Sequence, residues 1–106
     1  MKYDVVLTSK AKCQLDEACA WYAVQNADVA DVWYDGFVEV LISLESNPQR
    51  HGLAPENDAF PVELRQLSYG SGRRKTHRAL FVIRPDKVVV HAIRHLAQQD
   101  ITLDDL

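Results

Sequence analysis

The segment from Thr76 to His95 limits the possible folds of this chain more than any other. It reads THRALFVIRPDKVVVHAIRH, with runs of β-branched and large apolar residues on either side of Arg84-Pro85-Asp86-Lys87. Proline presets φ for the second position of a type I turn, and aspartate suits the position after it. The segment therefore predicts a β-hairpin that closes at residues 84–87.

A turn at these four residues assigns every side chain of the hairpin to one of two faces. The expected partners across the strands are Val82 with Val89, Leu80 with His91, Arg78 with Ile93 and Thr76 with His95. One face is apolar except at its far end and suits packing; it carries His77, Ala79, Phe81, Ile83, Val88, Val90, Ala92 and Arg94. The other face has Arg78 between His91 and His95 and is the candidate working surface. A slip of one residue would exchange the faces of a strand.

Size and composition indicate one globular domain, residues 1–106. The chain is 47% hydrophobic and 25% charged, which is ordinary for a soluble protein. No apolar run approaches the roughly 20 residues of a membrane span, and no signal-peptide pattern opens the chain. We therefore expect a cytoplasmic protein that does not contact a membrane.

The cysteines and histidines give no sign of a metal or cofactor. Cys13 and Cys19 are six residues apart in a helical pattern, about 240° around the helix axis, so they cannot form a disulfide with each other. We interpret them as small buried or half-buried thiols. The four histidines have no metal-ligand spacing. The sequence predicts no metal site and no cofactor.

The charges are strongly segregated along the chain. Residues 1–63 carry 4 Lys/Arg against 11 Asp/Glu, residues 64–95 carry 8 against 1, and residues 96–106 add 3 acids, so the sums are -7, +7 and -3. A basic block in an acidic chain indicates one surface for an anionic partner. The alternative is a solvated positive face with no partner.

The order of the predicted elements defines the fold class. A strand at residues 3–7 is followed by a helix from Thr8 or Ser9 to about Gln25, and by a second helix capped by Asp28 and ending near Pro48. A loop at 47–61 and a strand at 62–69 precede the hairpin. Gly36 in the second helix would let another backbone approach closely. This β-α-α-β-β-β order predicts an α+β fold with a helical hairpin on one face of a small antiparallel sheet.

A series of short motifs resembles the RelE/ParE superfamily of toxins from bacterial type II toxin–antitoxin systems. In chain order they are Trp21-Tyr22, Asn47-Pro48-Gln49-Arg50, Ala54-Pro55-Glu56, Glu63-Leu64-Arg65-Gln66-Leu67, HRALFVI at 77–83 and VVVHAIRH at 88–95. The resemblance implies a small protein of the plasmid-stabilisation type that arrests growth until a cognate antitoxin neutralises it in a hetero-oligomer. RelE-like members cut messenger RNA on the ribosome, and ParE-like members inhibit DNA gyrase. The Arg94-His95 ending, followed by Leu96-Ala97-Gln98-Gln99, is closer to the ParE-like branch.

The resemblance to the RelE-like branch implies a catalytic trio of Glu56, Arg78 and His95. Cutting RNA at a 2′-hydroxyl needs a base, an acid for the leaving oxygen and positive charge for the phosphate. Glutamate or histidine can serve the first two and arginine the third, and the hairpin register places Arg78 and His95 on one face. Against this, Glu56 could cap a turn or pair with Arg65 or Arg50, and only Lys75 and Lys87 lie in the basic block. Enzymatic activity therefore stays an alternative.

The other hypothesis is a surface that binds protein. An antitoxin bound as an extended segment and a helix suits a face that mixes apolar and cationic groups. Leu80, Val82, Val89 and Ile93 would supply apolar contacts. Arginines would receive acidic side chains; the predicted binding residues are Arg65, Arg73, Arg74, Arg78, Leu80 and Arg94. A family member that is inactive, or is used only for interaction, would keep the same surface.

Overall fold

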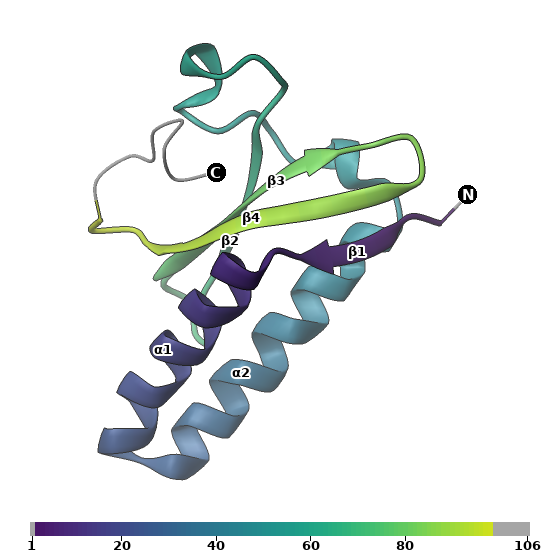
Figure 1. Ribbon diagram of the computed structural model, residues 1–106. Helices are drawn as coiled ribbons and strands as arrows, with labels where there is room; N and C mark the ends of the chain where they lie inside the picture. The colour runs from purple at the N-terminus through teal and green to yellow at the C-terminus, as the bar shows by residue number, and fades with distance from the viewer. Residues whose placement is uncertain (1, 99–106) are drawn as a thin grey trace.

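The computed structural model describes residues 2–98, which form two helices against a four-stranded sheet (Figure 1). The elements are β1 (Asp4–Leu7), α1 (Ser9–Gln25), α2 (Ala27–Ile42), β2 (Arg65–Tyr69), β3 (His77–Ile83) and β4 (Lys87–His95). This confirms the predicted order and the helical hairpin on one face. No helix in these residues is both long and apolar enough to cross a bilayer.

Side-chain caps explain where the two helices begin. The Thr8 hydroxyl accepts a hydrogen bond from the Ala11 backbone N–H at 3.1 Å, as the sequence predicted for α1. The predicted cap of α2 was wrong. Asn26, not Asp28, caps it, because the Asn26 side chain accepts from the N–H groups of Asp28 and Val29 at 2.9 and 3.3 Å. The link between the helices is therefore a single extended residue, which makes them antiparallel neighbours.

The sheet is mixed, with strand order β1-β4-β3-β2. β2, β3 and β4 are antiparallel neighbours, but β1 runs parallel to β4, from Asp4 beside Lys87 to Leu7 beside Val90. The expectation of an antiparallel sheet was wrong for this strand. The last strand lies inside the sheet, because β1 and β3 flank it on either side.

A β-bulge in β4 changes the predicted pairing of the hairpin. Near the turn, Val82 faces Val89 as predicted, but Leu80 faces Ala92 because His91 is an extra residue with no partner in β3. Beyond the bulge, the observed pairs are Ala79 with Ile93, Arg78 with Arg94 and His77 with His95. The predicted partners of Leu80, Arg78 and Thr76 were therefore wrong. Each residue of β4 after His91 has moved to the opposite face.

Each face of the sheet has its own apolar core. The core under the helices includes Trp33, Phe37, Leu67, Tyr69, Ala79, Phe81, Val88, Val90 and Ile93. The second core lies on the opposite face and consists of Ala54, Phe60, Leu64, Leu80, Val82 and Ala92. The face that was expected to be a working surface is therefore largely covered, and the cover is the segment of residues 47–64.

Hydrogen bonds fix this covering segment, residues 47–64, on the sheet. The Asn57 side chain accepts from the Leu64 N–H at 2.8 Å, and the Ala54 N–H donates to the Leu64 carbonyl at 2.7 Å. Leu53 forms an isolated antiparallel bridge with Arg65. β2 therefore begins at Arg65, not at the predicted Val62, because residues 62–64 belong to the cover.

We predict that Gly36→Ala destabilises the protein although alanine is the better helix former. A Cβ at Gly36 would collide with the hydroxyl of Tyr69, which donates to the Trp33 carbonyl at 2.9 Å. The close neighbour is thus a side chain and not the predicted backbone. Overpacking costs about 1–3 kcal/mol against a propensity gain of about 1 kcal/mol. We expect a net loss of up to about 2 kcal/mol in the free energy of unfolding, measured in urea.

The matched control is Gly72→Ala in the loop between β2 and β3. Nothing lies within 4 Å of a Cβ at this position. We expect a change in the free energy of unfolding within about 0.5 kcal/mol. Equal stability of the Gly36 and Gly72 variants would contradict the proposed contact.

Candidate functional site

A buried ion pair joins the covering segment to the middle of the sheet. Two nitrogens of Arg78 donate to the two carboxylate oxygens of Glu56 at 2.6 and 2.7 Å, and one of them also donates to Gln66 at 3.1 Å. The side chains of Arg78 and Glu56 are only 8% and 2% exposed. This is the two-pronged geometry in which arginine holds a carboxylate most strongly. The guanidinium is therefore engaged inside the protein.

The alternative partners of Glu56 are occupied elsewhere. Arg65 donates to the Glu63 carboxylate at 3.0 Å and to the His51 carbonyl at 2.7 Å. Arg50 donates to the Asn47 carbonyl at 3.0 Å. Glu56 therefore pairs with Arg78, and this ion pair connects the covering segment to the sheet.

His95 is not part of this contact. The bulge at His91 places His95 opposite His77 on the helix side of the sheet, with their ring centroids 5.0 Å apart. Arg78 faces Arg94 on the other side. The predicted arrangement of Arg78 and His95 on one face was therefore wrong. The structure brings Glu56 and Arg78 together and separates both from His95.

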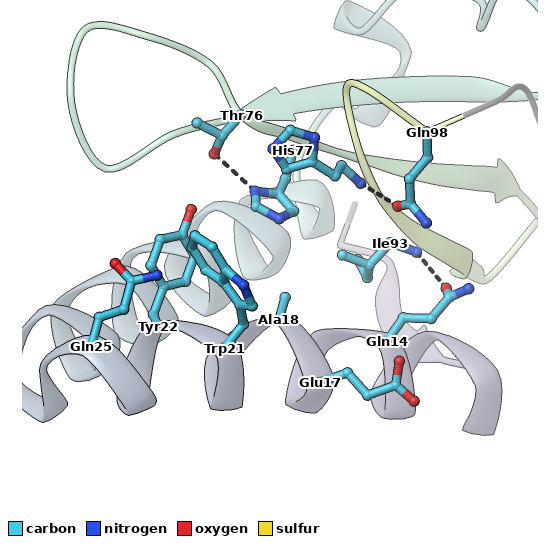
Figure 2. A pocket seen from close by; sticks show the side chains of 11 residues that line it. Gln14, Glu17, Ala18, Trp21, Tyr22, Gln25, Thr76, His77, Ile93 and Gln98 are labelled. Carbon is cyan, nitrogen blue, oxygen red and sulfur yellow. Dashed lines mark hydrogen bonds between the residues drawn. The ribbon is translucent and has the colours of Figure 1, made fainter.

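A groove lies between α1 and the open ends of β3 and β4 (Figure 2). We call it the α1–β4 groove. Its volume is about 660 Å³, within the usual range for ligand pockets. It is lined by Gln14, Glu17, Ala18, Trp21, Tyr22, Gln25, Thr76, His77, Ile93, His95 and Gln98.

Two glutamine side chains close the edge of β4 inside this groove. β1 pairs with β4 only as far as Val90, so the outward N–H groups beyond it need other acceptors. The carbonyl oxygens of Gln14 and Gln98 accept from Ile93 and His95 at 2.8 and 2.6 Å (Figure 2). The edge is therefore covered by side chains and not by a strand.

One imidazole of the groove, that of His77, is held in its neutral form. Burial, together with the nearby His95, lowers the pKa of His77 to about 4. His77 Nδ1 lies 2.8 Å from the Thr76 hydroxyl, and His95 Nδ1 accepts from the Ala97 N–H at 3.0 Å. No lysine or arginine lines the groove. It lacks the positive charge that phosphate chemistry needs and suits binding by shape and hydrogen bonds.

The described residues form no cluster of metal-binding side chains. Among residues 2–98, no three His, Cys, Asp or Glu side chains are grouped to hold an ion. Cys13 is exposed and Cys19 half-buried, and burial raises the pKa of the Cys19 thiol. The Cys19 thiol therefore lacks the lowered pKa of a reactive cysteine.

The predicted binding residues fall into three groups. Arg73 and Arg74 are exposed in the loop before β3, and Arg94 is half-buried opposite Arg78. Arg65 is half-buried and its guanidinium is bonded, as described above. Leu80 is completely buried in the second core, so its prediction as a contact residue was wrong.

The apolar contacts predicted around Leu80 were wrong for the same reasons. The covering segment already fills the space over Leu80 and Val82, which are 0% and 5% exposed. Ile93 lies on the helix side because of the bulge. Only Val89 of the predicted set is half-buried.

The sequence analysis missed the α1–β4 groove. It treated Trp21 and Tyr22 as parts of a family motif and gave His77 no role. A signal was present: Gln14, Ala18, Trp21 and Gln25 recur at helical spacing and form one stripe of α1. The other wall could not be found, because it depends on the position of the bulge.

Comparisons with known proteins identify the fold. No family model matches the sequence, and no curated protein matches it. A solved structure described as the "Chromosomal ParDE TA system from P. aeruginosa" is similar, with a TM-score of 0.69 and 20% sequence identity over 89% of this chain and 96% of that one. The chain has the ParE-like fold.

We predict that breaking the buried pair destabilises the fold far more than removing both charges. Arg78→Met leaves Glu56 buried without its main partner, and Glu56→Gln similarly strands Arg78. Each single change should cost about 3–5 kcal/mol in urea unfolding. The double variant Glu56→Gln, Arg78→Met should lose less free energy of unfolding than the two single losses added together. A double loss equal to that sum would contradict a direct interaction.

We predict a loss of stability in mild acid that depends on His77. The pKa of His77 has its ordinary value of 6.5 in the unfolded chain and is about 4 in the folded protein. Between these values the unfolded state binds a proton that the native state does not, so stability falls as the pH decreases. The loss between pH 7 and pH 5 is about 2 kcal/mol. His77→Gln should remove this part of the pH dependence, whereas His91→Gln should retain it; an unchanged profile in His77→Gln would sink the assignment.

Proposed function

We propose that this chain is the toxin of a type II toxin–antitoxin system of the ParE-like kind. A cognate antitoxin neutralises it, and it acts by binding and inhibiting a protein target such as DNA gyrase. The observation that carries this proposal is the ParE-like fold combined with an Arg78 that is locked to Glu56. The fold suggests the class of protein, and the ion pair argues for binding over RNA cleavage.

The arrangement of the predicted catalytic trio supports binding. A phosphate-stabilising arginine must reach the substrate, but Arg78 is 6% exposed and bonded to Glu56 and Gln66. His95 lies on the other side of the sheet. A ribonuclease using these three residues would need the covering segment to leave the sheet and expose its apolar core.

The exposed basic loop supports an acidic antitoxin as the partner. Arg73, Arg74 and Lys75 follow one another on the surface. Opposite charges across an interface speed association and select the partner. Arg94 is partly exposed on the face of the sheet opposite the helices and could extend the same contact.

Expression of the chain alone should arrest growth, and co-expression of the small protein encoded beside it should relieve the arrest. Purified protein should inhibit supercoiling by gyrase and leave messenger RNA on translating ribosomes intact. His95→Ala should keep full inhibition, because His95 has no catalytic role. Messenger-RNA cleavage that disappears in His95→Ala would instead establish the ribonuclease.

The antitoxin contact has its own test. Arg73→Glu with Arg74→Glu should weaken antitoxin binding by about tenfold or more, measured by calorimetry at low salt. Lys87→Glu, which changes an exposed charge at the far end of the hairpin, is the matched control. An equal loss of antitoxin affinity in both variants would show that the effect depends only on net charge.

A further inference from the structure

The α1–β4 groove continues into an unusually apolar surface on the helical hairpin. Trp21 at its rim is 62% exposed, and Val24, one turn further along α1, is 88% exposed. Val29 and Val32, on the first turns of α2, are 48% and 65% exposed. Figure 1 shows this end of the hairpin extending beyond the sheet. Large apolar side chains gathered at one end of a molecule mark a contact surface.

The same hairpin is acidic beyond the first turn of α1, which carries Lys10 and Lys12. Residues 13–49 contain no lysine, arginine or histidine, and their acids are Asp16, Glu17, Asp28, Asp31, Asp35, Glu39 and Glu45. Glu17 lines the groove itself. A partner that binds this surface therefore needs positive charge next to an apolar patch of its own.

The loop that leads into the other wall of the groove is basic. Thr76 lines the groove, and the three residues before it are Arg73, Arg74 and Lys75, all exposed. The structure gives none of the three an ion pair with any residue in 2–98. Each molecule therefore presents an acidic, apolar wall and a cationic rim on the two sides of one groove.

We propose that two copies of this chain pair across the α1–β4 groove about a two-fold axis. A two-fold rotation places the basic loop of each copy against the acidic hairpin of the other, so that both charge contacts form together. Trp21 from each copy then lies near the centre of the interface, where buried tryptophans contribute most to binding. The occupant is a second copy because this chain itself offers the cationic and apolar groups that the groove requires.

Sedimentation equilibrium of the full-length chain tests the pairing directly. We expect a reversible dimer with a Kd on the order of 10 μM at low salt. Raising the salt from about 0.05 M to about 0.5 M should weaken it several-fold, because exposed charge contacts are screened. A monomer at ten times this concentration in low salt would overturn the proposal.

Two apolar variants separate the groove from general surface hydrophobicity. Trp21→Ala should weaken the dimer by at least about tenfold. Leu53→Ala removes an apolar side chain that is 49% exposed outside the groove, and it should leave the dimer unchanged. A dimer that survives Trp21→Ala and is lost in Leu53→Ala would place the interface elsewhere. Circular dichroism confirms that each variant is folded.

A charge exchange identifies which surfaces meet. Glu17→Lys with Asp28→Lys should abolish the homodimer, and so should Arg73→Glu with Arg74→Glu. Mixing the two double variants should restore both contacts, because the reversed hairpin of one faces the reversed loop of the other and the two unchanged surfaces also meet. Absence of a mixed dimer when both double variants are folded would falsify the two-fold arrangement. The measurement uses this chain alone, so it stands apart from the antitoxin and gyrase tests.

Discussion

The ion pair between Glu56 and Arg78 holds the two halves of this architecture together. The helix side of the sheet is a conventional core of aromatic and aliphatic side chains. The other side depends on a segment with little regular structure, residues 47–64, that must remain in place over Leu80 and Val82. A two-pronged, buried contact ties this segment to the start of β3. A buried charge without its partner is costly, so the cover cannot detach without exposing both a charge and a core.

One inserted residue, His91, determines which surface can have which role. It moves Ile93 and His95 to the helix side, where they complete the α1–β4 groove, and leaves Arg78 with Arg94 on the other side. The groove thus gains His95 beside His77, and none of the described residues that line it is a lysine or an arginine. The positive charge collects in the exposed loop before β3. Recognition of a protein partner and stability of the sheet are consequently assigned to different faces.

Local patterns in the sequence were sufficient for most of the fold. Alternation predicted the hairpin, a cap residue predicted the start of α1, and proline predicted the turn at residues 84–87. The bulge left no comparable signal, because valine, histidine and alanine in succession fit regular and bulged strands equally well. The predicted site was wrong for the same reason. Arg78 and His95 were assigned to one face by a register that is correct only near the turn. The covering segment was expected to be a loop, since its few apolar residues, Ala54, Phe60 and Leu64, lack any period.

The position of β4 has a consequence for how the protein is made. β4 is the last strand synthesised, yet it lies between β1 and β3, and its partner β1 comes from the first residues of the chain. Contacts between such distant residues form late, because a long loop must close first. On the ribosome, β1 therefore waits with an open edge while the helical hairpin forms beside it. The sheet is completed only after residues 87–95 have left the exit tunnel.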